Sequence, residues 1–155
     1  MTRLSSAFGS NYTADSLRTK TFELGGHTFK VRVPLTKEME AIQERIENID
    51  ESDYKARFEK MTASFKDSTA LEGIVVTDDD VIIEGRSTRE LVKSIMQMEN
   101  RTVEYIKLIV PEHDTLDDIT YKEIDEEWPF QVQLEMLNKI SEAIQPGYRN
   151  PEKTN

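Results

Sequence analysis

The sequence predicts an α+β fold that is mainly helical, with an N-terminal β-hairpin, a second short hairpin and about four to five amphipathic helices. Residues 21–33 and 73–85 hold short apolar runs around turn residues, which is the pattern of paired strands. Longer segments repeat apolar residues every three or four positions, which is the pattern of helices with one buried face. The 155 residues are enough for a single domain with its own core.

The predicted domain spans residues 21–147. Residues 1–20 are polar and lack steady apolar periodicity, so we expect a flexible N-terminal arm. Residues 148–155 follow a Pro-Gly pair that ends the last predicted helix. We therefore expect a flexible C-terminal tail.

The first predicted hairpin is TFELGGHTFKVRV, and its register follows from the glycine pair. A two-residue primed turn at Gly25 and Gly26 places Phe22 opposite Phe29. One face then carries apolar side chains and the other polar ones, which is typical of a half-buried sheet that ends before Pro34. The apolar face comprises Phe22, Leu24, Phe29, Val31 and Val33.

Two apolar stripes with helical spacing follow Pro34. Thr36 is suited to cap the first, and the second is out of phase with it. Two helices, or one helix broken near residues 50–52, both fit. The stripes comprise Met39, Ile42, Ile46 and Ile49, and then Tyr54, Phe58, Met61 and Phe65. We interpret both as core, and keep Phe58 and Met61 as a weaker candidate for a partner surface.

The second predicted hairpin, GIVVTDDDVIIEG, carries three consecutive aspartates, Asp78–Asp80. A calcium loop instead spaces its ligands at alternate positions and closes with a glutamate. This pattern favours a solvated turn over a metal site.

A capping box, STRE at Ser87–Glu90, opens the longest predicted helix, which ends before Pro111. Its apolar side chains cover more than a coiled-coil seam, so we expect this helix at the centre of the fold. The main stripe comprises Leu91, Ile95, Met98, Thr102, Tyr105 and Ile109, and a flanking row of Val92, Met96, Val103 and Ile106 widens it.

Residues 112–127, which we call the acidic segment, carry eight carboxylates against one lysine. Thr120 and Glu123 form a second capping box, and Pro129 ends that short helix at Trp128. Paired catalytic carboxylates need two distinct environments and a substrate cleft, and neither is indicated. The charges are better explained by solubility and by the macrodipole at a helix N-terminus.

The final predicted helix, from Phe130 to Ile144, is amphipathic and starts immediately after the only tryptophan. Its large apolar side chains can serve either a private core or a partner. The candidate partner-binding residues are Trp128, Phe130, Leu134 and Leu137.

Charge and composition restrict the classes of partner that this chain can bind. The formal net charge is −10, and residues 1–20 carry +2, so residues 21–155 carry −12. Such a body repels nucleic acid and anionic membranes, and no apolar stretch reaches the roughly 20 residues of a membrane span. The lack of cysteine and of a secretory signal fits a reducing cytoplasm.

Catalytic motifs are missing from the sequence. His27 and His113 belong to different predicted elements without metal-ligand spacing, and no phosphate loop, dinucleotide fingerprint or nucleophile elbow is present. We therefore expect a non-enzyme with no catalytic residues, no cofactor and no metal.

The order of segments resembles the tail assembly chaperones of long-tailed bacteriophages. The resemblance rests on VRVPLTKEMEAI after the glycine-pair hairpin, on the acidic helical body, and on EEWPFQVQLEMLNKISEAIQP. It implies a protein of the host cytoplasm that binds and solubilises the tape measure protein and is absent from the mature virion. A frameshifted longer product would recruit the tail tube protein. A homo-oligomer is compatible with this role.

Two alternatives remain open at this point. One is a structural tail or head-tail component that stays in the virion. The other is an acidic inhibitor that mimics DNA, suggested by the −12 body, although the carboxylates concentrate in the acidic segment instead of spreading along a face.

Overall fold

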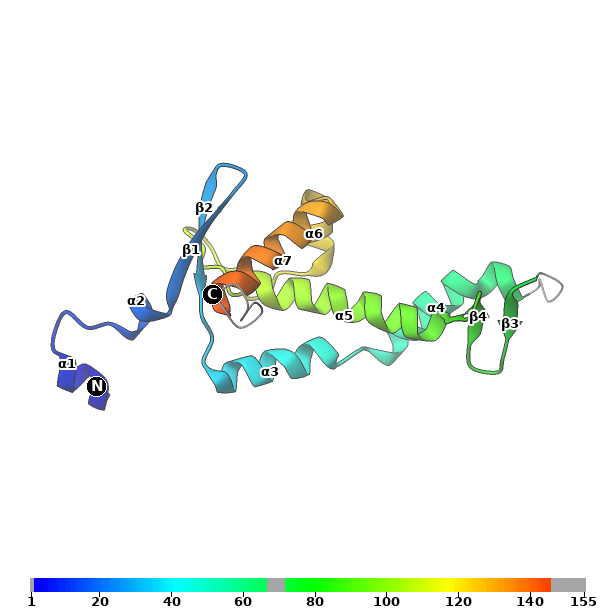
Figure 1. Cartoon of the computed structure of the whole chain (residues 1–155), viewed down its shortest axis with the longest axis horizontal. Coiled ribbons are helices and arrows are strands. Elements are labelled where there is room, and N and C mark those ends of the chain that lie inside the picture. Colours follow the sequence, from blue (N-terminus) through cyan, green and yellow to red (C-terminus); the bar gives the residue numbers. More distant parts are fainter. Residues whose placement is uncertain (1, 67–71, 146–155) are drawn as a thin grey trace, which may run out of the picture. The chain divides into compact units, whose positions relative to one another are not determined.

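The computed structural model describes residues 2–66 and 72–145, which form seven helices and five strands (Figure 1). The fold is α+β and mainly helical, as predicted, with one two-stranded and one three-stranded antiparallel sheet. The chain divides into two compact units. The first unit takes residues up to 42 and from 102 onward, and the second takes residues 43–101.

The first unit is built on the N-terminal hairpin. Its elements are α1 (Arg3–Phe8), α2 (Ala14–Arg18), β1 (Thr19–Leu24), β2 (His27–Arg32), the start of α3 (Thr36–Glu47), the end of α5 (Thr88–Ile106), α6 (Tyr121–Glu127) and α7 (Phe130–Ile144). The short helices α1 and α2 bury no residue. They were not predicted, because residues 1–20 lack steady apolar periodicity. The predicted tail, 148–155, lies outside the described residues.

The hairpin has the predicted register. Phe22 pairs with Phe29, and their rings stack with centroids 5.3 Å apart. Gly25 and Gly26 have φ of 61° and 79°, the two positive values that a type I′ turn requires and that glycine adopts without strain. On the apolar face Val31 is 0% exposed. The prediction of a half-buried sheet is therefore confirmed.

A segment distant in sequence extends this sheet. The Arg32 N–H donates to the Leu108 carbonyl at 2.8 Å, and the Val110 N–H donates to the Lys30 carbonyl at 2.8 Å. Val31 and Ile109 lie opposite each other between these bonds. Helix α7 packs on both strands of the hairpin, close to them in Figure 1. The resulting core includes Val31, Ile106, Ile109, Ile124, Met136, Leu137, Ile140 and Ile144.

Arg18 and Glu38 join the N-terminal residues to the hairpin. The Val33 N–H donates to the Arg18 carbonyl at 2.6 Å, so the pairing reaches into the residues predicted as an arm. The Arg18 guanidinium contacts Glu38 at 2.6 Å. Glu38 also accepts the Leu35 N–H at 3.2 Å, and this bond, rather than a Thr36 cap, starts α3 at Thr36. The hydrogen bond from the Leu35 N–H lowers the pKa of Glu38. Burial opposes this shift, and the positive charges of Arg18 and Arg32 add to it.

The second unit shows that the two stripes after Pro34 form two helices. Helix α3 ends at Glu47 and α4 spans Glu51–Lys66. The Asp50 carboxylate accepts the Asp53 N–H at 2.8 Å, which caps α4 and accounts for the break. Ile49 therefore lies between the helices.

The predicted second hairpin carries a further strand. Strands β3 (Ile74–Val76) and β4 (Val81–Ile83) pair as expected, and a turn at Glu84 and Gly85 adds β5 (Arg86–Ser87). This strand is too short and polar to have been predicted. Helix α5 then starts. The Glu90 N–H donates to the Ser87 hydroxyl at 3.1 Å, which is one of the two hydrogen bonds of the predicted capping box.

The predicted stripe on α5 is wrong at its N-terminal end. Leu91 and Ile95 are exposed, whereas their neighbours Val92 and Met96 are buried. The stripe and its flanking row both had helical spacing, and only the packing partners decide which row faces inward.

A buried glutamine fixes the corner between α6 and α7. Gln133 is 1% exposed, and its amide nitrogen donates to the Trp128 carbonyl at 2.9 Å and to Asp125 at 3.1 Å. Its amide oxygen accepts from the Tyr121 hydroxyl at 2.9 Å. Because both of its donors and its oxygen have partners, the amide is buried without a large penalty.

Replacing this amide should destabilise the first unit. We expect Gln133→Ala to lower the free energy of unfolding by about 2 kcal/mol, because it removes three part-buried hydrogen bonds and leaves a cavity at a buried position. Gln131→Ala, on the exposed side of the same helix, should change it by less than about 0.5 kcal/mol. Urea denaturation measures both. Equal losses would show that the Gln133 network does not stabilise the corner.

Candidate functional site

Trp128 lines an apolar cavity in the first unit, which we call the Trp128 cavity. Its volume is about 350 Å³. The Trp128 N–H donates to the Ile124 carbonyl at 2.8 Å and its carbonyl accepts from Gln133, so its backbone is held on both sides. The lining residues are Phe29, Ile106, Ile109, Leu116, Ile119, Glu123, Ile124, Glu127 and Trp128.

The other predicted site residues on α7 divide between surface and core. Phe130 is 56% exposed, Leu134 is half-buried, and Leu137 is only 7% exposed. Trp128 itself is half-buried. The stripe therefore runs from the surface into the core along the helix. Leu137 packs in the core, Phe130 is exposed, and Trp128 and Leu134 are each partly accessible.

The acidic segment contributes two carboxylates, Glu123 and Glu127, to the lining of this site. All eight of its carboxylates belong to exposed residues. Glu123 accepts the Thr120 N–H at 2.9 Å, which completes the predicted capping box of α6. Lys122 lies 3.9 Å from Glu126, four residues along the same helix. Most of this negative charge is therefore presented to solvent.

The weaker predicted pair, Phe58 and Met61, belongs to the second unit. Met61 is 41% exposed, and Phe58 is half-buried and stacks on Tyr54. Met61 lines an open depression of about 520 Å³, which we call the α4–α5 groove, together with Arg57, Lys60, Val92 and Ile95. Arg57 is held there by Glu99 through two bonds of 2.7 and 2.8 Å.

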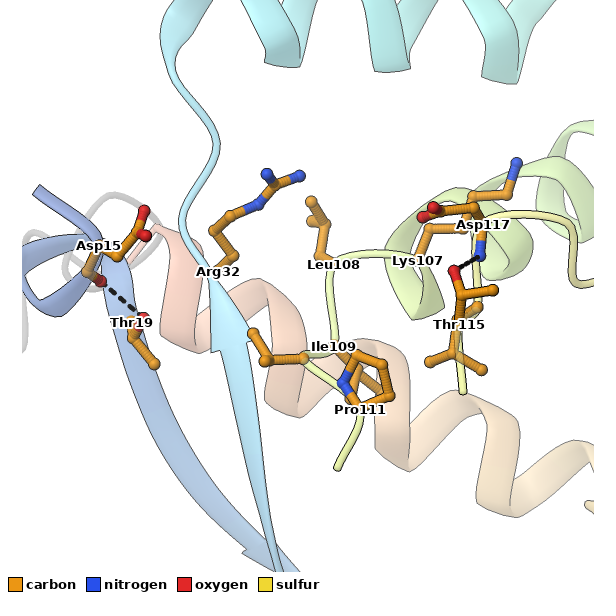
Figure 2. A pocket seen from close by; sticks show the side chains of 11 residues that line it. Asp15, Thr19, Arg32, Lys107, Leu108, Ile109, Pro111, Thr115 and Asp117 are labelled. Carbon is orange, nitrogen blue, oxygen red and sulfur yellow. Dashed lines mark hydrogen bonds between the residues drawn. The ribbon is translucent and has the colours of Figure 1, made fainter. Parts of the chain in front are cut away.

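A third cavity, of about 370 Å³, lies beside the backbone pairing between β2 and residues 108–110 (Figure 2). Arg32 comes from the strand, and Lys107 and Asp117 lie on the other side of Leu108. Arg32 is 3.7 Å from Glu38, and Lys107 is 3.5 Å from Glu104. Both cations already have carboxylate partners, so this cavity offers no unpaired positive charge for an anion.

Asp80 has a structural role that the sequence did not reveal. Its carboxylate accepts the Val81 N–H at 2.8 Å, the Arg89 N–H at 2.9 Å and the Ser87 hydroxyl. It therefore ties the β3–β4 turn to the start of α5. Burial raises the pKa of Asp80, but these three hydrogen bonds outweigh it and lower the pKa. Asp78 and Asp79 are exposed, as a solvated turn predicts.

Within residues 2–66 and 72–145, no group of three or more His, Cys, Asp or Glu side chains is arranged to hold a metal ion. Over the same residues, no helix combines the length and the apolar character that crossing a membrane requires. Comparison of the chain with models of protein families, with curated proteins and with solved structures found no match.

The Asp80 contacts predict a pH-dependent contribution to stability. A lowered pKa in the folded state means that the contribution is complete above the pKa of an ordinary aspartate and is lost as the pH falls through the lowered value. We expect Asp80→Asn to cost about 1 kcal/mol near neutral pH, and the difference from the wild type to vanish well below about pH 4.

Thermal unfolding across a pH series measures this difference. Asp78→Asn removes the same charge from an exposed neighbour and should leave stability nearly unchanged. A difference for Asp80→Asn that persists in acid would mean that the ionised carboxylate is not the stabilising form.

Proposed function

We propose that this chain is a phage tail assembly chaperone that binds and solubilises the tape measure protein and helps to recruit tail tube subunits. The observation that carries the proposal is the exposed Phe130 beside the half-buried Trp128, next to the acidic segment. The proposal also rests on the resemblance at VRVPLTKEMEAI and at EEWPFQVQLEMLNKISEAIQP.

A chaperone for a long helical client has two physical requirements. It must present apolar side chains that replace the contacts that the client would otherwise make with itself. It must also carry enough charge to keep the complex dissolved. Phe130 and the Trp128 cavity meet the first requirement, and the exposed carboxylates of the acidic segment meet the second.

The second unit adds an independent apolar surface. The α4–α5 groove exposes Met61 and Ile95 and has an apolar floor at Val92. Methionine adapts to irregular apolar shapes, which suits contacts with many different positions along a client. A chain with two apolar surfaces of modest size can bind at many places along a client without a strict sequence requirement.

Client solubilisation tests the proposal through the exposed Phe130 and the half-buried Trp128. In cells that co-express the chain with the tape measure protein, we expect wild type to keep the client in the soluble fraction. Trp128→Ala with Phe130→Ala should reduce that fraction several-fold, because it removes the accessible apolar contacts.

The matched control is Leu35→Ala, because Leu35 is as exposed as Phe130, at 56%, but belongs neither to the cavity lining nor to α7. It should solubilise the client as wild type does. Circular dichroism of each variant checks that helical content is kept. Global unfolding of the double variant would assign Trp128 and Phe130 to the core, and an insoluble client with the wild-type chain would refute the proposal.

A chaperone of this kind leaves the particle before assembly ends. Mass spectrometry of purified mature virions should therefore yield no abundant peptides from this chain, whereas lysates taken during assembly should yield them together with the tape measure protein. Abundant peptides in mature virions would instead support a structural tail component.

A further inference from the structure

We propose that the Trp128 cavity binds a basic amphipathic helix, which inserts an apolar side chain into the cavity and pairs lysine or arginine residues with Glu123 and Glu127. This inference rests on the proposed function, because it names the kind of client segment that the cavity selects. It goes further by assigning the selectivity to two carboxylates on α6.

The cavity has the size and lining of a site for one apolar anchor. Its volume of about 350 Å³ is at the lower end of the range typical of ligand pockets, about 300 to 1,000 Å³. Phe29, Ile109 and Ile124 supply apolar lining, and Trp128 adds an aromatic face on which a cation can stack.

The two carboxylates have a spacing that a helix can match. Glu123 and Glu127 are four residues apart on α6, which separates them by about 6 Å along the helix axis. Both line the cavity. A partner helix with basic residues at positions i and i+4 presents charges with the same spacing on one face.

These carboxylates are available to a partner. Glu127 has no cationic partner among residues 2–66 and 72–145, and the Thr120 cap uses one oxygen of Glu123. The surrounding acidic segment repels an acidic helix and attracts a basic one. Charge complementarity therefore commits the cavity to a basic partner.

The α4–α5 groove serves as an internal comparison because no carboxylate lines it. Its charged lining residues are Lys60 and Arg57, which is paired with Glu99, so the lining offers a basic helix no partner for its charges. A basic peptide should therefore report on the Trp128 cavity.

The chain contains its own probe for this site, because Trp128 is the only tryptophan. The ligands are two synthetic helical peptides of about 16 residues, or four turns, which share one leucine stripe and differ only in flanking lysines or flanking glutamates. Each peptide is titrated into the full chain while the Trp128 emission is recorded. We expect the lysine peptide to shift the emission to shorter wavelength and to bind about tenfold more tightly than the glutamate peptide at low salt. High salt should narrow this difference.

A pair of double variants separates recognition by the cavity from general attraction. Glu123→Gln with Glu127→Gln removes two charges at the cavity, and Gln at position 123 preserves the capping box. Asp118→Asn with Glu126→Gln removes two charges from residues that do not line it. We expect about fivefold weaker binding of the lysine peptide by the first variant and less than about twofold by the second.

Equal affinity for the two peptides would overturn the inference, and so would equal weakening by the two double variants. A chain that solubilises the tape measure protein without preferring the lysine peptide keeps the proposed function and loses this inference. A chain that prefers the lysine peptide but leaves the tape measure protein insoluble refutes the proposed function and keeps a basic-helix site for another partner.

Discussion

The first unit depends on the backbone pairing between β2 and residues 108–110. Two hydrogen bonds of 2.8 Å hold Val31 opposite Ile109 and bring the end of α5 onto the N-terminal hairpin. This pairing places Phe29 beside Ile106 and Ile109 in the lining of the Trp128 cavity. Without it the two-stranded hairpin would rely on its packing against α7 alone. The cavity is therefore a consequence of a contact between distant parts of the chain.

The Gln133 network positions the other side of the same cavity. The proline after Trp128 ends α6 but leaves the direction of α7 undetermined. Gln133 resolves it, because its amide contacts the Trp128 carbonyl, Asp125 and the Tyr121 hydroxyl at once. A buried polar group of this kind disfavours other arrangements, in which its partners would be lost. It keeps Trp128 at the corner, where the side chain lines the cavity and remains partly accessible.

Local signals in the sequence predicted the local features of this fold. The Gly25-Gly26 pair gave the hairpin register, Thr120 with Glu123 gave the α6 cap, and Pro129 gave the break after Trp128. The β2 pairing with residues 108–110 was not predicted, because it joins segments that no periodicity connects. The inward row of α5 was predicted wrongly at Leu91 and Ile95 for the same reason, since spacing alone does not identify the packing partner. Of the candidate site, Trp128 and Phe130 are accessible, whereas Leu137 is in the core.

The net charge of this chain opposes the self-association that an accessible apolar surface favours. Copies of this chain carry a net charge of −10 and repel one another, so Phe130 and the Trp128 cavity are less prone to self-association than the same side chains on a neutral surface. The same negative charge attracts a basic helix and repels an acidic one. Discrimination between such helices then needs little shape complementarity, because acidic helices are repelled before they make contact. For the proposed chaperone, which would bind many positions along one client, rejection by charge and retention by apolar contact are compatible, whereas a closely fitting pocket would restrict binding to one sequence.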